Sequence, residues 1–348
     1  MFKQVNGAKW YALGFFPPVL AYLLFRIYYF SDVLPNTYYA KSAFVSKVIL
    51  LKSAVLYLGK WSIEWVPVAL LIFLILMNSD QSRAVLPIII SIPVIATVFL
   101  GGGDHMKGIR LMLPALILTG YGSAMAMKSR FRRPSVLIVI LAVIVVSLQL
   151  FSATVHWSLP LFPMTFGLKP RSFAAAHGEI VGRFLENNLP PGTLVAVNSA
   201  GAPPYFGRSL SFIDMLGLND RAIARRRINR ITTWYQRKPG HFKGDGRYVL
   251  SRRPDVIMIG LTYGFLTGTK DNLFLSDYEI VNDPSFKENY RPFKIEVPIT
   301  DRQRNWYEVR QYLKEGRYFI IVWLRKASEK TNKLRNLGTQ LGIEKAVD

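Results

Sequence analysis

Five long apolar runs lie within the first 155 residues, and they constrain the fold more than any other feature of the chain. The runs are Trp10–Tyr29, Ile63–Met77, Ala84–Leu100, Leu111–Met127 and Ser135–Val155. A helix needs about 20 predominantly apolar residues to cross the hydrocarbon core of a bilayer. We therefore predict an α-helical multi-span membrane domain with about five transmembrane helices, covering residues 1–160.

The charged segments between these runs predict the orientation of the chain. Lys128–Pro134 is strongly basic, and cytoplasmic loops collect lysine and arginine. Counting spans from this loop puts the N-terminus in the cytoplasm and places loops 30–61 and 101–110, together with everything after His156, on the outer face. No cleavage pattern of small residues follows the first run, so it is expected to remain as a helix. The predicted localisation is the bacterial inner (plasma) membrane, multi-pass.

From about Leu168 the pattern changes to that of a soluble domain. Ser172–Asn188 has the apolar spacing of a helix and ends at a Pro-Pro-Gly turn. Short β-rich runs follow at Leu194–Val197, Leu210–Ile213, Val256–Ile259, Tyr278–Val281 and Tyr318–Leu324. Strands that alternate with helices favour a sheet covered by helices. We expect a small extracytoplasmic α/β domain at 168–327 and a flexible tail at 328–348.

The charge of the chain limits the classes of molecule that it is expected to bind. The net charge is +22. Residues 1–157 carry +10 of it, and residues 158–348 carry +12. A basic surface beside a bilayer attracts anionic lipids or phosphorylated ligands, and a chain tethered in a membrane is a poor nucleic-acid binder, so no nucleic acid is expected. The chain has no cysteine, which excludes disulfides and thiolate metal sites.

Loop 30–61 contains Leu34–Lys41, whose sequence is LPNTYYAK. One interpretation is a turn with an aromatic belt, because tyrosines anchor proteins at membrane interfaces. The other is a ligand site, in which the tyrosine rings form a sugar platform and Lys41 pairs with a phosphate. The following segment, Phe44–Leu58, has apolar residues at helical spacing with lysines on other faces, which indicates an amphipathic helix in the interface.

Loop 101–110 has the sequence GGGDHMKGIR. Three glycines let backbone amides approach an anion, Lys107 and Arg110 add positive charge, and Asp104 would act as a base or hold a divalent cation. The alternative is a flexible polar turn between antiparallel membrane helices. His105 has no second ligand nearby in the sequence, so no metal-binding residues are predicted.

Polar residues and glycines also follow two expected strands, in Val197–Gly201 and Ile213–Leu218. The carboxyl ends of strands are where α/β sheets bind ligands. The chain has no dinucleotide-binding, nucleophile-elbow or Walker motif. The basic stretch Arg221–Arg230 is most simply a solvated or lipid-facing surface.

Three of these motifs occur together in one known family. They are Tyr28–Tyr29 with Leu34–Lys41, then Gly102–Met106 with Arg110 and Pro114, and then Ile213–Leu218. With them the chain resembles the polyprenyl-phosphate-dependent membrane glycosyltransferases of the GT-C superfamily, and within it the terminal arabinofuranosyltransferase-like branch. The resemblance extends from the first expected span to the soluble domain.

The resemblance implies an enzyme that transfers a sugar from a polyprenyl-phosphate donor to a glycan, lipid or protein acceptor on the outer face. In this family an aspartate in the first external loop is the usual catalytic base, and further spans precede the region where this sequence starts. Met1–Lys9 contains no acid. The chain is therefore expected to be a C-terminal portion, completed by an N-terminal partner chain. The alternative is a non-catalytic membrane scaffold or carrier-binding subunit of a cell-envelope assembly system.

The site is expected where loops 30–61 and 101–110 together surround the phosphate and sugar of the donor. Asp104 is the candidate catalytic residue, and a divalent cation is the only cofactor considered. The residues expected to bind substrate are Tyr29, Asn36, Tyr38, Lys41, His105, Lys107 and Arg110.

Overall fold

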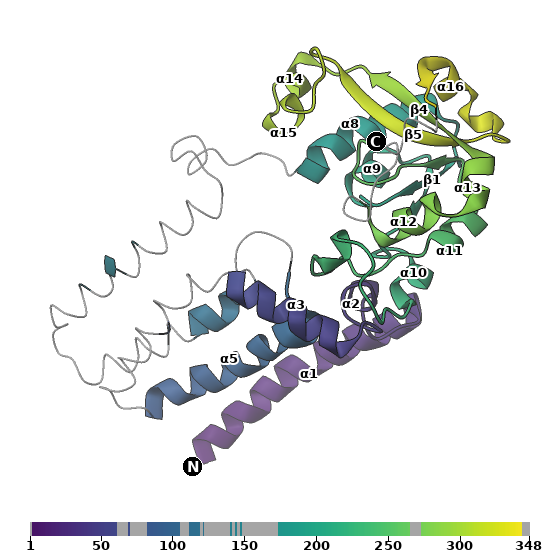
Figure 1. Ribbon diagram of the computed structural model, residues 1–348. Coiled ribbons are helices and arrows are strands. Elements are labelled where there is room, and N and C mark those ends of the chain that lie inside the picture. Colours follow the sequence, from purple (N-terminus) through teal and green to yellow (C-terminus); the bar gives the residue numbers. More distant parts are fainter. Residues whose placement is uncertain are drawn as a thin grey trace.

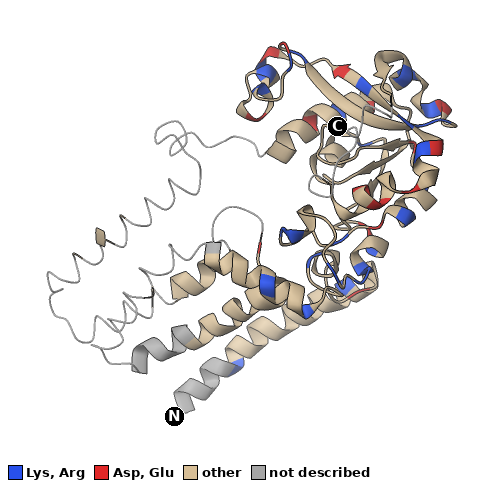
Figure 2. Cartoon of the chain, in the orientation of Figure 1, with Lys and Arg blue, Asp and Glu red and all other residues tan. Residues whose placement is uncertain are grey.

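The computed structural model describes residues 2–60, 82–104, 111–118, 173–264 and 273–342, together with the single residues 69, 121, 140, 143, 144 and 147. Within these ranges a group of helices precedes a mixed α/β domain (Figure 1). The described parts of the long helices carry few charges, whereas charged residues are spread over the α/β domain (Figure 2).

The first element, α1 (Phe2–Phe30), is a helix of 29 residues. Its segment Lys9–Phe30 has 22 residues and a mean hydropathy of 1.4, so it is long and apolar enough to span a membrane. Large apolar side chains along it, such as Phe15, Phe16 and Leu20, are exposed in the chain. An exposed apolar surface of this extent is typical of a helix that contacts lipid or a partner.

The expected multi-span membrane domain of about five helices is wrong for the residues described. Among them, α1 alone has the length and apolarity of a span. In α5 (Ser82–Gly101), the apolar stretch Ile89–Gly101 is shorter than a bilayer requires. The remainder is a mixed α/β sheet domain. The physical reason is that an apolar run does not determine how long its helix continues or what the helix packs against.

Parts of the other expected spans cannot be compared in this way. Runs 63–77 and 135–155 lie outside the described residues apart from isolated positions, and run 111–127 is described only at 111–118 and 121.

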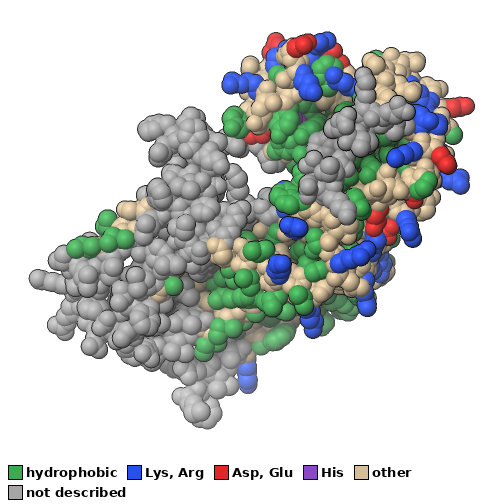
Figure 3. All heavy atoms as spheres, viewed as in Figure 1, with side chains coloured by type: hydrophobic (Ala, Val, Ile, Leu, Met, Phe, Trp, Pro, Cys, Tyr) green, Lys and Arg blue, Asp and Glu red, His purple; other side chains and the backbone are tan. Residues whose placement is uncertain are grey.

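Two further helices follow α1 and lead to the candidate site. They are α2 (Asn36–Lys41) and α3 (Lys47–Lys60), and α3 agrees with the amphipathic helix expected at 44–58. α3 packs beside α5, with Ala54 and Tyr57 buried against Val98. Apolar side chains gather over the helical part of the molecule (Figure 3).

The α/β domain is built on a six-stranded sheet with the order β2-β1-β3-β5-β4-β6. The strands are β1 (Leu194–Val197), β2 (Ser211–Asp214), β3 (Val256–Ile257), β4 (Tyr290–Val297), β5 (Tyr318–Arg325) and β6 (Gly338–Gln340). β1 pairs in parallel with both β2 and β3, and the other pairings are antiparallel. The carboxyl ends of β1, β2 and β3 therefore share one edge of the sheet.

Helices precede and connect these strands. They are α8 (Phe173–Asn188), α9 (Ala202–Phe206), α10 (Arg221–Arg225), η1 (Tyr235–Arg237), α11 (Gly246–Ser251), α12 (Leu275–Val281), α13 (Pro284–Asn289), α14 (Asp301–Arg304), α15 (Tyr307–Arg310), η2 (Glu329–Thr331) and α16 (Asn332–Leu337). The expected helix Ser172–Asn188 agrees with α8. The expected strand Tyr278–Val281 is wrong and belongs to α12. There the Asp277 carboxylate accepts the Phe274 N–H at 3.2 Å, which begins a helix.

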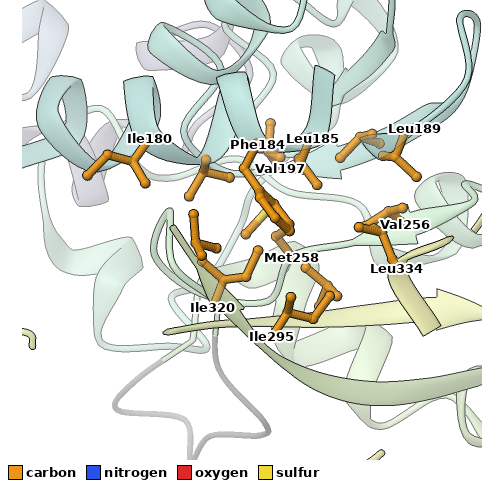
Figure 4. Packing of buried hydrophobic residues seen from close by; sticks show 14 of the residues in the cluster. Ile180, Phe184, Leu185, Leu189, Val197, Val256, Met258, Ile295, Ile320 and Leu334 are labelled. Carbon is orange, nitrogen blue, oxygen red and sulfur yellow. The ribbon is translucent and has the colours of Figure 1, made fainter. Parts of the chain in front are cut away.

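The core of the domain lies between α8 and one face of the sheet. Ile180, Phe184 and Leu185 occupy one stripe of α8 and point toward Val197 and Val256 on the strands (Figure 4). A second apolar cluster covers the other face of the sheet, under α11 and α12. The two clusters hold the shared carboxyl edge of the parallel strands in place, and the loops that leave this edge extend toward α2 and α3.

The buried His177 of α8 contacts both β5 and α15. Its ring nitrogens lie 2.5 Å from the Tyr318 hydroxyl and 3.0 Å from the Glu308 carbonyl oxygen. Burial lowers the pKa of His177 to about 4, so the ring is neutral at physiological pH.

Candidate functional site

The loop after β2 is folded around the carboxylate of Asp214. Its oxygens accept the backbone N–H of Leu216 at 3.0 Å and that of Asn219 at 2.7 Å. Burial raises the pKa of Asp214, and these backbone bonds oppose the rise. Gly217 has φ +78°, and a Cβ there would lie 2.8 Å from the Ala224 nitrogen, so the tight turn requires glycine.

Asn36, at the start of α2, holds this loop from the outside. Its side-chain amide donates to the carbonyl oxygens of Gly217 at 2.9 Å and Leu218 at 3.0 Å. Two segments that are about 180 positions apart in the sequence therefore meet directly. Both belong to the motifs on which the family resemblance depends.

An ion pair beside α2 supports the same contact. Arg225 of α10 pairs with Asp32 and lies over the ring of Tyr39, with its guanidinium carbon 4.1 Å from the ring centroid. The Tyr39 hydroxyl donates to Asp32 at 2.8 Å. This hydrogen bond, together with the nearby Arg225 charge, lowers the pKa of Asp32. The three side chains lock α2 against α10.

A buried lysine completes the contact between the two parts of the chain. Lys243 is 1% exposed, and its ammonium donates to the carbonyl oxygens of Ala43, at 2.8 Å, and of Arg226. Burial, and then the charge of Arg226, lowers the pKa of Lys243 to about 8. Backbone bonds between residues 44–46 and Ile228 lie beside it. We call this contact of residues 32–46 with residues 214–245 the junction.

A cavity of about 340 Å³ lies next to the junction, between α3 and the segment 231–242. Its lining residues are Ile49, Lys52, Ser53, Leu56, Ile231, Arg237 and Phe242. We call it the junction cavity. It combines two cationic side chains with a mostly apolar wall, and the Ser53 hydroxyl is buried without a hydrogen-bond partner in the described structure. A buried polar atom without a partner is uncommon in proteins.

The glycine-rich turn at the end of α5 packs against α3, the helix that lines the junction cavity. Gly102 and Gly103 have φ +78° and +82°, and a Cβ at Gly103 would lie 2.6 Å from the Cβ of Tyr57 on α3. A Cβ at Gly101 would lie 3.8 Å from the hydroxyl of Ser42, just after α2. Residues 101–103 therefore lie beside both α2 and α3. The next residue, Asp104, is 8% exposed.

The predicted site residues fall into three groups. Asn36 and Lys41 lie on α2, at the junction. Tyr29 and Tyr38 are exposed, and Tyr29 stacks on Phe25 at the end of α1. His105, Lys107 and Arg110 lie outside the described residues. Their proposed contacts with substrate stay predictions.

Sequence reasoning missed several residues that build the site. They are Asp32, Arg237 and Lys243, whereas Arg225 belongs to the basic stretch expected to be a solvated or lipid-facing surface and instead pairs with Asp32. Lysine and arginine are mostly exposed in proteins, so none of these bases differs in sequence from an ordinary surface residue. In the parts of the chain that are described, no three histidine, aspartate or glutamate side chains form a group able to hold a metal ion.

A second polar network lies at the carboxyl edge of β1 and β3. Asp277 is fully buried and accepts hydrogen bonds from the Asn198 amide at 2.9 Å and the Gly260 N–H at 3.0 Å. Burial raises the pKa of Asp277 to about 7, against the opposing effect of these bonds. The network joins the strand ends to α12, and thereby to the loops of the junction.

Residues 171–315 match a family described as a domain of unknown function (DUF8728). The match begins just before α8 and ends before β5, so it covers most of the α/β domain and the domain's side of the junction. No curated protein and no solved structure matches the chain.

Proposed function

We propose that this chain forms the donor-binding part of a membrane glycosyltransferase that uses a polyprenyl-phosphate sugar. The observation that carries the proposal is the convergence at the junction. The Asn36 amide contacts the Gly217–Leu218 loop, and the Gly101–Gly103 turn packs on α3 beside it. Segments that carry the three motifs of the resemblance thus lie together around α2 and α3, and α3 also lines the junction cavity.

The junction cavity has the chemistry that a lipid phosphate needs. Lys52 and Arg237 supply two positive charges, and the unpartnered Ser53 hydroxyl supplies a hydrogen-bond donor. Leu56 lines the cavity and is also one of the exposed apolar residues of α3, together with Val48 and Val55. A phosphate bound between the cations could therefore leave its hydrocarbon chain along the apolar face of α3.

In the proposed reaction an acceptor hydroxyl attacks the anomeric carbon of the donor sugar. The bond from that carbon to the phosphate oxygen breaks, and the phosphate leaves with the electron pair. Cations beside the phosphate stabilise the leaving group, and a base takes the hydroxyl proton. Asp104 is the candidate base on this chain. A partner chain that carries a further acidic loop is compatible with the same arrangement.

We place the α/β domain on the outer face of the bacterial inner membrane, with α1 as an anchor. The basic character of the chain supports a position beside anionic lipid. The acceptor would then approach from the cell envelope.

The test uses the full chain in lipid nanodiscs with a radiolabelled polyprenyl-phosphate sugar. Each cation near a lipid surface contributes about 1 kcal/mol, so removing both Lys52 and Arg237 should weaken binding about thirtyfold. Lys47→Ala with Arg208→Ala, which removes two cations that do not line the cavity, is the matched control. Undiminished binding in the cavity variant would contradict the proposal.

Transfer is measured separately with a cell-envelope acceptor fraction. Loss of transfer in Asp104→Asn with retained donor binding assigns Asp104 to the chemistry. Donor binding without any transfer by the wild-type chain favours the carrier-binding subunit instead. This outcome would support donor binding at the junction cavity and contradict the proposal that the chain is an enzyme.

A further inference from the structure

A groove of about 850 Å³ lies on the α/β domain between α11 and the α12–α13 segment. It is separate from the junction cavity, with which it shares no lining residue. Nothing in the proposed function uses it.

The floor of the groove is a fixed array of polar groups. The Arg226 guanidinium donates to both carboxylate oxygens of Glu279 at 2.7 Å, and also to the Gly244 carbonyl oxygen at 2.6 Å. Glu279 accepts in addition the Gly246 N–H at 2.8 Å. Asp245 lies 3.9 Å from the same guanidinium. Planar groups held in this way keep their remaining hydrogen-bonding positions at fixed directions.

Two tyrosines form the walls. Tyr248 comes from α11, and its hydroxyl is held by Asp220 at 3.2 Å and by Arg252 at 3.0 Å. Tyr278 comes from α12, and both rings are partly exposed. Aromatic rings offer a large apolar face at low cost in conformational entropy, which suits the C–H face of a sugar ring.

The net charge of the groove lining indicates which class of polar ligand it would bind. Its lining contains Arg226 and Arg247 but three carboxylates, Asp245, Glu279 and Asp283, so it is slightly acidic. The chain as a whole has a charge of +22. A groove for a phosphate, a nucleic acid or an anionic polysaccharide would have the opposite balance. A neutral ligand rich in hydroxyl groups fits both the charge and the fixed donors and acceptors.

We propose that this groove binds a segment of a neutral oligosaccharide. Arg225 and Arg226 are consecutive, and the first holds the junction while the second forms the groove floor. A glycan bound in the groove would therefore lie near the junction. That it is the acceptor of sugar transfer rests on the proposed function, whereas its binding does not.

The experiment measures binding to the full chain in detergent micelles by saturation-transfer difference NMR and calorimetry. The probes are neutral oligosaccharides of arabinose, galactose, mannose and glucose, with oligogalacturonate as the charged comparison. We expect binding of at least one neutral probe and none of oligogalacturonate. Tyr278→Ala should weaken it about three- to tenfold through the lost ring contact, and Arg247→Ala, an exposed rim change, should also weaken it.

Tyr307→Ala on α15 is the matched control, because Tyr307 is an exposed tyrosine outside the groove. It should leave binding unchanged. Thermal unfolding checks that Tyr278→Ala still folds, and Arg247→Ala tests the groove if it does not. Failure of every neutral probe to bind, preference for oligogalacturonate, or equal binding by the Arg247 variant and wild type would overturn the proposal. If the wild-type chain binds the polyprenyl-phosphate donor but no neutral glycan, the groove proposal fails while the proposed function is unaffected.

Discussion

Replacing Asn36 by alanine should loosen the loop after β2 without unfolding the α/β domain. The substitution removes two hydrogen bonds, to the carbonyl oxygens of Gly217 and Leu218. Each bond contributes about 0.5–1.5 kcal/mol, and both are only partly buried, so that water can replace part of the loss. We expect the free energy of local opening to fall by about 1–2 kcal/mol, which corresponds to about five- to thirtyfold more frequent opening.

Hydrogen exchange in nanodiscs measures this opening directly. The N–H groups of Leu216 and Asn219 are bonded to Asp214 and report whether the loop is closed. Their exchange should accelerate by that factor in Asn36→Ala, while amides in the core strands keep their protection. Thr37→Ala, at the next and exposed position, is the control. Unchanged exchange at both amides, or equal acceleration in the control, would refute the role given to Asn36.

Three further predictions follow from the described packing. Because the His177 pKa is lowered to about 4 from 6.5, its contribution to stability is complete above pH 6.5 and is lost as the pH falls to 4, by about 3 kcal/mol. Asp277, with a pKa raised to about 7 from 3.8, has the opposite effect, since its folded form takes up a proton first and gains stability over the same fall. Between pH 6.5 and 4, the melting temperature should therefore fall more steeply with acid in Asp277→Asn than in the wild-type chain, and less steeply in His177→Phe. Melting profiles identical to that of the wild-type chain would contradict both assignments. Gly103→Ala should destabilise the chain by at least about 1 kcal/mol, because φ is +82° and the new Cβ would lie 2.6 Å from a side-chain carbon of α3. Gly59→Ala, with open space around it, should be neutral or stabilising, and equal melting of the two variants would argue against this packing.

Local patterns in the sequence predict some elements well. The apolar stripe before the Pro-Pro-Gly turn indicates α8, and the lysine-interrupted apolar spacing indicates α3. The sequence analysis does not predict β4, although Phe293–Val297 alternates apolar and charged residues as a half-buried strand does, because the strand begins with Tyr290-Arg291-Pro292 and proline is typical of turns and strand edges. The expected number of spans is wrong for the described residues, because apolar composition does not determine helix length.

The candidate site shows what tertiary structure adds to the motifs. Their order in the sequence indicates that they act together, but only the fold shows that the Asn36 amide meets the carbonyls after Asp214. Lys243 has no distinctive sequence signal apart from its glycine-rich surroundings, and it becomes fully buried because two carbonyl oxygens accept from its ammonium. Long-range contacts of this kind depend on packing that no local pattern encodes.

The most direct test of the proposed function is a cryo-EM map of the full chain in nanodiscs with added polyprenyl phosphate. We expect phosphate density between Lys52 and Arg237, within hydrogen-bonding distance of the Ser53 hydroxyl, and chain density along the apolar face of α3. Phosphate density at another place, with the junction cavity free of it at saturating lipid, would contradict the donor-binding assignment.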